Sequence, residues 1–579
     1  MRRFNYFVIF VSISLSDLGF IASTNLCDDY DYLDVPIDHF HPENKMTFKL
    51  RFMHKTANYE KNGPLFFHPG GQNSMEHDIE RMKLFDDLAD EFNAALLFSE
   101  HRFYGDSQPF PTEHIRKIKG QLEYLSVLQA LMDFVKLIQY FKNTFLKNAN
   151  AKVIAYGGEY SGMLAAWLRV RHPDVIHGAW SSTAPVRYFE NGFVKDNAFY
   201  YQLNYIYRNT PGCDVALLSE RILDVEKHTQ LFDESVHTEE VAEKCKEFNQ
   251  AWSIDERTSL QDYRDCERLF MFILDAFLGL ADRNLPYPTD FDGLKLPAWP
   301  IKEACQSLAT EEPAVQLYKF ISAYYNPNKS YGSLCIYPEK CPERRYSSTN
   351  RAAQIYQMCS ELPIYLGAGF TVDFVNGSTG QLAQSFVGNL SFMSWPPYYY
   401  GTDLIKEFLE DYDLERHLDN HFVEFAFGYD YATNGSTNII FTTPELAPWS
   451  SGAVSRDNYH NSIYSFSISA AAPKHDLYQP NNCDPLSVAV QILKCWTGQP
   501  PGPGVDCGDL ENSVLQPLPI VEMEDLMRQG QSECSYIHKG YPWGQFVALG
   551  MNNSIKISVT YALVLLVFGN VICQICVYF

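Results

Sequence analysis

The chain is poor in basic residues. Its 46 lysines and arginines stand against 70 aspartates and glutamates, which gives a formal net charge of −24 at pH 7. A surface of this sign repels phosphate groups, so nucleic acid and anionic membrane surfaces are not expected as direct partners. Metal-binding spacings are also lacking, because the single C-x-x-C pair, Cys573 and Cys576, lies in an apolar tail. We therefore expect no metal site and no cofactor.

A second absence is the G-x-S-x-G motif, which occurs nowhere in the 579 residues. That motif places a serine on a sharp turn between a strand and a helix, with its hydroxyl exposed. The context of such a turn is nevertheless present. A β-branched and aromatic run at 153–156 leads into Gly157 and Gly158, and a helix-forming run begins at Met163. Glu159 stands at the position of the serine, so the sequence predicts the turn without its nucleophile.

Apolar sequence, in contrast, is plentiful. With 46% hydrophobic and 15% aromatic residues, the composition is typical of globular proteins with large cores. Both ends carry targeting patterns. A basic start, an apolar run and small residues predict a signal peptide at 1–23. The apolar segment 554–579 predicts a membrane anchor, either one transmembrane segment or a signal exchanged for a glycolipid near 550–554.

These end signals predict passage through the secretory pathway, to the extracellular surface or the lysosome. Twelve of the 14 cysteines lie between them, and an even number in a secreted chain favours disulfides. Sequons predict glycosylation at five asparagines, which are Asn328, Asn376, Asn389, Asn434 and Asn552.

The order of patterns along the chain predicts an α/β fold with an insertion. Over 24–195, strand-like runs alternate with helical ones, which favours βαβ units and a mainly parallel sheet. Over 196–425, charged helical stretches and cysteines predict a helical insertion. Strand patterns return over 426–496, where we expect the sheet to resume. A Pro/Gly linker and a short C-terminal region are expected over 497–553.

Four stretches carry long ordered motifs. They are L-F-S-E-H-R-F-Y-G-D-S at 97–107, G-G-E-Y-S-G-M-L-A-A-W at 157–167, L-P-A-W-P-I-K at 296–302, and N-I-I-F through L-A-P-W-S at 438–450. Together they resemble the prolyl carboxypeptidase family of lysosomal and secreted serine exopeptidases, which includes a dipeptidyl peptidase. The resemblance covers about residues 28–495. It implies an α/β-hydrolase fold, interrupted by a helical cap, with disulfides Cys213–Cys305 and Cys245–Cys335.

Carried over residue by residue, the resemblance implies a degenerate catalytic triad. The family's serine falls on Glu159 and its aspartate on Ala447. Its histidine falls on Pro473, or on Lys474 if one residue is deleted. The family's T-G-N-E-G turn, which supplies oxyanion contacts, is replaced by residues 69–73. Because a serine attacks only when a base removes its proton and a carboxylate orients that base, we expect no serine-type hydrolysis.

Three functions are weighed on these grounds. We favour a surface-anchored or secreted homologue that has lost catalysis and binds a peptide or protein ligand. The alternative is an active exopeptidase that cleaves next to proline through a rearranged site, for which Ser161, Glu445 and His475 are the candidates. Ser161 replaces a glycine at a close helix–strand contact, so a packing role is its other interpretation. A purely structural surface or gut-lumen protein is the third. The oligomeric state stays open, with a homodimer as one alternative.

Overall fold

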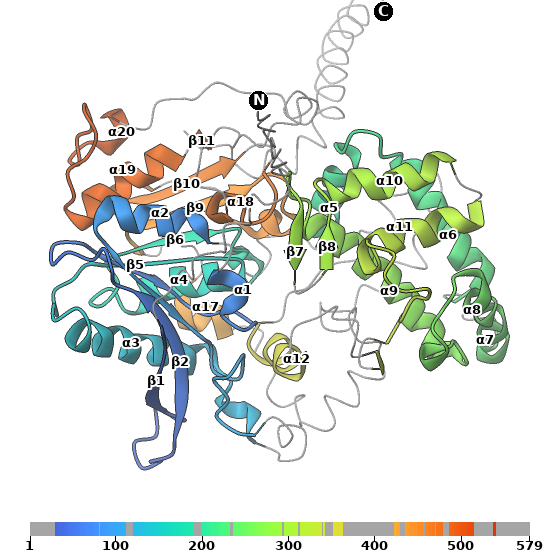
Figure 1. Ribbon diagram of the computed structural model, residues 1–579, viewed down its shortest axis with the longest axis horizontal. Helices are drawn as coiled ribbons and strands as arrows, with labels where there is room; N and C mark the ends of the chain where they lie inside the picture. The colour runs from blue at the N-terminus through green and yellow to red at the C-terminus, as the bar shows by residue number, and fades with distance from the viewer. Residues whose placement is uncertain are drawn as a thin grey trace, which may run out of the picture.

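A computed structural model describes residues 29–79, 82–111, 120–189, 198–231, 235–291, 294–310, 313–337, 340–341, 351–362, 422–428, 435–454, 458–468, 471–478, 486–513 and 537–539. The predicted signal peptide and the predicted anchor segment lie outside these residues, as do all the predicted glycosylation sites except Asn328. Asn328 is exposed in a turn. Figure 1 shows a sheet part, in blue and orange, beside a helical part, in green.

A nine-stranded sheet forms the centre of the sheet part, in the order β1-β2-β4-β3-β5-β6-β9-β10-β11. The strands from β4 through β10 pair in parallel, whereas β1–β2, β2–β4 and β10–β11 pair antiparallel. Helices on both faces complete an α/β-hydrolase fold, so the predicted fold class is confirmed. The bounds are β1 Asp29–Pro36, β2 Thr47–Lys55, β3 Leu65–His68, β4 Ala95–Ser99, β5 Val153–Gly158, β6 Gly178–Ser182, β9 Ile439–Pro444, β10 Ile463–Ile468 and β11 Ile537–Lys539.

Neighbouring residues of the central strands feed two separate apolar layers. Phe66 and Phe67 of β3 are both fully buried, but they pack in different clusters because successive side chains of a strand point to opposite faces. One layer is covered by α2 (Lys83–Phe92) and α19 (Leu486–Thr497), and the other by α3 (Val127–Thr144) and α4 (Tyr160–Arg171). Short helices complete this part, namely α1 Glu76–Ile79, α17 Phe422–Phe427, α18 His475–Tyr478 and α20 Leu510–Ser513.

The helical part lies in sequence between β6 and α17. Its longest helix, α9 (Tyr263–Asp282), begins with a reciprocal cap in which the side chains of Asp262 and Asp265 accept each other's backbone N–H groups. The remaining elements are α5 Ala198–Arg208, α6 Val215–Thr229, α7 Thr238–Lys246, α8 Phe248–Ala251, α10 Pro300–Thr310, α11 Pro313–Tyr325, α12 Arg351–Ser360 and the hairpin strands β7 Thr289–Phe291 and β8 Leu294–Leu296. Among the described residues, no helix combines the length and apolarity needed to cross a bilayer.

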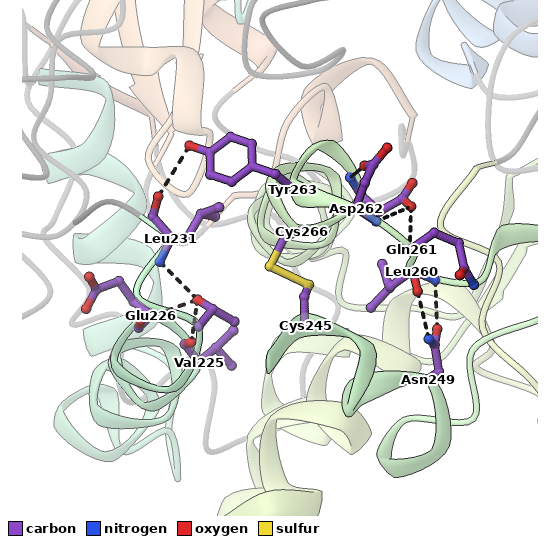
Figure 2. Close-up of a disulfide and its surroundings, with 12 residues drawn as sticks. Val225, Glu226, Leu231, Cys245, Asn249, Leu260, Gln261, Asp262, Tyr263 and Cys266 are labelled. Carbon is purple, nitrogen blue, oxygen red and sulfur yellow. Dashed lines mark hydrogen bonds between the residues drawn. A yellow bond between two sulfur atoms is a disulfide. The ribbon is translucent and has the colours of Figure 1, made fainter. Parts of the chain in front are cut away.

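Disulfides tie the helical part together, and one predicted pairing is corrected. Cys213 is bonded to Cys305, as the resemblance implied. Cys245 of α7 is bonded to Cys266 of α9, so the predicted Cys245–Cys335 disulfide is wrong (Figure 2). The reason is helix packing, because α7 lies against α9 and brings the two Cα atoms to 5.7 Å, a bridging distance. The other described disulfides are Cys335–Cys341 and Cys495–Cys507.

Candidate active site

The turn between β5 and α4 has the sharp geometry expected of a nucleophile elbow. Glu159 occupies it with φ 54° and ψ −122°, a conformation that costs a non-glycine residue roughly 1–3 kcal/mol. The Glu159 N–H donates to the carbonyl oxygen of Ser182 at 2.9 Å, and its own carbonyl accepts from the N–H of Met163 at 2.9 Å. The elbow therefore presents a carboxylate where the fold presents a nucleophile.

Close packing of β5 against α4 requires small residues on both sides of this turn. A Cβ added to Gly157 would lie 2.6 Å from the carbonyl carbon of Ser161, and one added to Gly162 would lie 2.8 Å from the carbonyl oxygen of Ser182. Ser161 is itself buried, and its Oγ lies 2.8 Å from the position a Cβ on Gly71 would take. These contacts fix the turn in place whatever side chain it carries.

Lys474 completes an ion pair at the elbow. Its Nζ lies 2.7 Å from Oε2 of Glu159, and the two side chains are 16% and 31% exposed. The lysine stem runs over Gly158, where a Cβ would lie only 2.5 Å from Lys474 Cγ. Burial alone would lower the pKa of Lys474, but the charge of Glu159, followed by Tyr478 and Asp78, raises it above its ordinary value. The ammonium group is therefore held protonated.

The segment that carries Lys474 is held against β6 and β9 by Asp476. Its Oδ1 accepts from Ser182 Oγ at 2.8 Å and its Oδ2 from Thr442 Oγ1 at 2.5 Å. The N–H of Lys474 donates to Thr183 Oγ1 at 3.2 Å. Burial raises the pKa of Asp476, against the opposing effect of these hydrogen bonds. This network holds the backbone of Lys474 so that its side chain reaches Glu159.

Ala447 and Pro473, onto which the resemblance carries the family's aspartate and histidine, contribute no ionisable side chain. Ala447 is fully buried at the start of the 3₁₀ turn η7 (Pro448–Gly452), where its carbonyl accepts from the N–H of Ser450 at 3.1 Å. Pro473 is buried one residue before Lys474. Of the two predicted alignments for the family's histidine, Lys474 is the residue whose side chain reaches Glu159.

The three residues of the alternative triad lie against three different parts of the molecule. Ser161 is packed against the loop that contains Gly71. Glu445 accepts from the hydroxyl of Tyr205 on α5 through Oε1, at 2.6 Å. The ring of His475 lies 5.9 Å from that of Tyr287, and burial lowers its pKa to about 4. A neutral, buried imidazole in that position faces the helical part of the molecule.

A carboxamide network covers the other side of the elbow. Gln357 of α12 is fully buried and accepts from the Tyr104 hydroxyl at 2.6 Å and from Gln72 Nε2 at 3.2 Å. Its own Nε2 donates to the hydroxyl of Tyr160, the residue after Glu159, at 2.9 Å. The same hydroxyl of Tyr160 also lies 3.2 Å from Nε2 of His101. The loop at 69–73 is thus bound to α12 through Gln72.

His101 and Arg102 belong to buried polar contacts at the end of β4. Arg102 donates to both carboxylate oxygens of Asp133, at 2.7 and 2.8 Å, and to the carbonyl oxygens of Ile37 and Tyr124. Burial lowers the pKa of His101 to about 4. These contacts hold loops together beneath the site.

Comparison with known proteins identifies the family. The family profile described as serine carboxypeptidase S28 matches residues 35–492. The chain belongs to this family. Prolyl carboxy peptidase like protein 5 of Caenorhabditis elegans is 32% identical over 479 residues, which cover 80% of this chain and 89% of that protein. Lysosomal Pro-X carboxypeptidase of Homo sapiens is 27% identical over 483 residues, which cover 80% of this chain and 87% of the human protein.

One residue of this S28-family site carries no signal in the sequence. Asp282, the last residue of α9, approaches the elbow from the helical part. Its burial and then the charge of Glu159 raise its pKa to about 7, while Arg283 and Lys474 act in the opposite direction. Asp282 belongs to none of the four motifs, and its place near Glu159 depends on how α9 packs onto the sheet part. No pattern in the sequence indicates that Asp282 lies near Glu159.

Proposed function

We propose that this S28-family chain does not hydrolyse peptides by the serine mechanism and acts by binding a peptide or protein ligand. The ion pair between Glu159 and Lys474 carries the proposal. A carboxylate offers no hydroxyl for base-assisted attack, and a protonated ammonium cannot accept the proton that an imidazole base would take. Ala447 has no group to orient such a base. Since loss of one member of such a triad removes most of the rate enhancement, loss of all three leaves little chemistry.

The ligand class follows from the family. The names of the curated relatives, which include lysosomal Pro-X carboxypeptidases, point to peptides with proline near an end. For this chain we infer a peptide or protein ligand bound without cleavage. The disulfides of the helical part and these relatives also support a location in the secretory pathway or the lysosome, with anchorage by 554–579 as part of the same proposal.

A fluorophosphonate probe and a proline-containing peptide test the loss of activity. We expect the purified full-length protein to show no labelling at a serine and no peptide cleavage. The rearranged triad predicts the reverse, with labelling at Ser161. Labelling that disappears in Ser161→Ala, together with turnover that disappears in the same variant, would overturn the proposal.

Restoring the triad separates a binding protein from a purely structural one. The triple variant Glu159→Ser, Ala447→Asp and Lys474→His would supply a hydroxyl at the elbow, and a carboxylate and an imidazole at the two other positions. If the site still accepts peptides, we expect labelling at position 159 and measurable peptide cleavage. Glu159→Ser alone is the matched control and should stay inactive, because it lacks the base. A triple variant that folds and binds no peptide would favour the structural interpretation.

A further inference from the structure

Asp282 is half-buried where the helical part meets the sheet part, with one of its carboxylate oxygens fully enclosed. After α9 ends at this residue, Leu285 joins the apolar layer beneath α2 and α19, and Tyr287 packs against His475. Within the described part of the chain, no hydrogen bond or ion pair reaches the Asp282 carboxylate, and its Oδ1 is completely buried. Ionisation of this carboxyl group is costly, because Oδ1 has lost its water and gained no hydrogen-bond partner.

The charges around Asp282 offset the cost of its ionisation only in part, because burial and the charge of Glu159 outweigh Arg283 and Lys474. Glu159 and Lys474 face it from the sheet part and compensate each other as an ion pair. The C-terminal end of α9 adds a partial negative charge of its own. The titratable groups that interact with Asp282 are Glu159, Lys474, Asp275, Arg283 and, on α11, Tyr324. Beyond Lys474 lie Asp78, Tyr478 and the buried His68.

We propose that Asp282 makes the docking of the helical part onto the sheet part depend on pH, so that docking is tight when Asp282 is protonated and loosened when it is ionised. The inference concerns the interface, and it holds whether the site at Glu159 binds a ligand or performs chemistry.

The direction of the pH dependence follows from the raised pKa of Asp282 in the docked state. Opening the interface returns the Asp282 carboxyl to water, where its pKa falls from about 7 towards its ordinary value of 3.8. Between these two values the docked state binds a proton that the open state releases. The open population therefore rises with pH, by at most about tenfold for each pH unit between pH 4 and pH 7. Acidic conditions close the interface and neutral conditions open it.

Hydrogen–deuterium exchange of the full-length protein at pH 5 and pH 7.5 tests this proposal. After correction for intrinsic exchange, we expect peptides covering 282–287 and 471–478 to lose protection by about tenfold or more at the higher pH. Asp282→Asn cannot ionise, so its protection should be the same at both pH values. Glu303→Gln, which removes an exposed carboxylate from α10, is the control and should behave like wild type.

A second variant keeps the test decisive if Asp282→Asn does not fold. Glu159→Gln removes the like charge and leaves Lys474 to interact with Asp282, which lowers the pKa of Asp282 in the docked state. The loss of protection should therefore level off at a lower pH than in wild type and be smaller in total. Equal protection of the wild type at both pH values would overturn the proposal. So would pH dependence that is unchanged in Asp282→Asn, or in Glu159→Gln where that variant alone folds.

Discussion

The ion pair at the elbow predicts an unequal response to the loss of its two partners. In Lys474→Met the stem still packs over Gly158, but the charge is lost. Glu159 is then left near a second carboxylate, Asp282, with no other ion pair in the described part of the chain. In Glu159→Gln, by contrast, Lys474 retains the negative charges of Asp282 and Asp78 nearby. We therefore expect the lysine variant to be the less stable one.

How far the Glu159–Lys474 ion pair is exposed to solvent sets how much stability is lost when one partner is removed. Removing one partner of a fully buried pair costs about 3–5 kcal/mol, whereas exposed pairs contribute about 0–1 kcal/mol. The side chains of Lys474 and Glu159, at 16% and 31% exposed, fall between these limits. We expect a loss of about 2–3 kcal/mol for Lys474→Met and about 1 kcal/mol for Glu159→Gln at pH 8. In the double variant, the loss of stability should be smaller than the sum of the two single losses by about 1–2 kcal/mol.

Urea denaturation followed by tryptophan fluorescence measures these differences, since urea does not screen charges. Shifts of the midpoint at an unchanged slope report stability. Lys246→Met, which breaks the exposed pair with Glu243, is the matched control and should cost no more than about 0.5 kcal/mol. At pH 5 the penalty of Lys474→Met should shrink, because Asp282 is protonated there. Additive single effects, or a larger loss for Glu159→Gln, would refute the reasoning.

Three further predictions concern the elbow and the corrected disulfide. Gly158→Ala would place a Cβ 2.5 Å from Lys474 Cγ, so we expect a loss of about 1–3 kcal/mol in urea denaturation that mostly disappears in a Lys474→Ala background. Glu159→Gly should be more stable than Glu159→Ala by about 1 kcal/mol, because only glycine relaxes the positive φ; equal midpoints would contradict this. Non-reducing peptide mapping should recover Cys245 linked to Cys266, and replacing both with alanine should cost about 3 kcal/mol for a closed loop of 21 residues. A peptide that links Cys245 to any other cysteine would show this pairing to be wrong.

The sheet could be predicted from the sequence because its central strands are buried on both faces. β5, β9 and β10 read as short apolar runs bounded by turns, and every residue of the three strands is buried. The elbow was predictable for a similar reason, since Gly157 and Gly158 between a strand pattern and a helix pattern leave few alternatives. The helical runs expected between the strands over 24–195 include α3, Val127–Thr144.

Features that depend on packing between distant segments could not be predicted. Pro473 and Lys474 differ by one residue in the alignment with the family's histidine, and the sequence leaves both open. That the side chain of Lys474 reaches Glu159 depends on the bonds of Asp476 to β6 and β9. The partner of Cys245 is decided by the contact of α7 with α9, which leaves no local trace. Asp282 is charged and ends an amphipathic helix, where a solvated side chain is the ordinary expectation. Only the docking of α9 onto the sheet part encloses one of its carboxylate oxygens.

The strained backbone at Glu159 has its cause in packing and not in chemistry. Gly157 and Gly162 bring β5 and α4 so close that any residue between them must take the same sharp turn. Exchange of one non-glycine side chain for another at this position therefore leaves the cost of the turn unchanged, and the turn itself loses no stability when a serine is replaced by a glutamate. A carboxylate introduced there does add an unfavourable charge, which Lys474 offsets. The loss of catalysis that we propose thus needs only changes of side chains, and the architecture of the family can remain intact around a site with a different use.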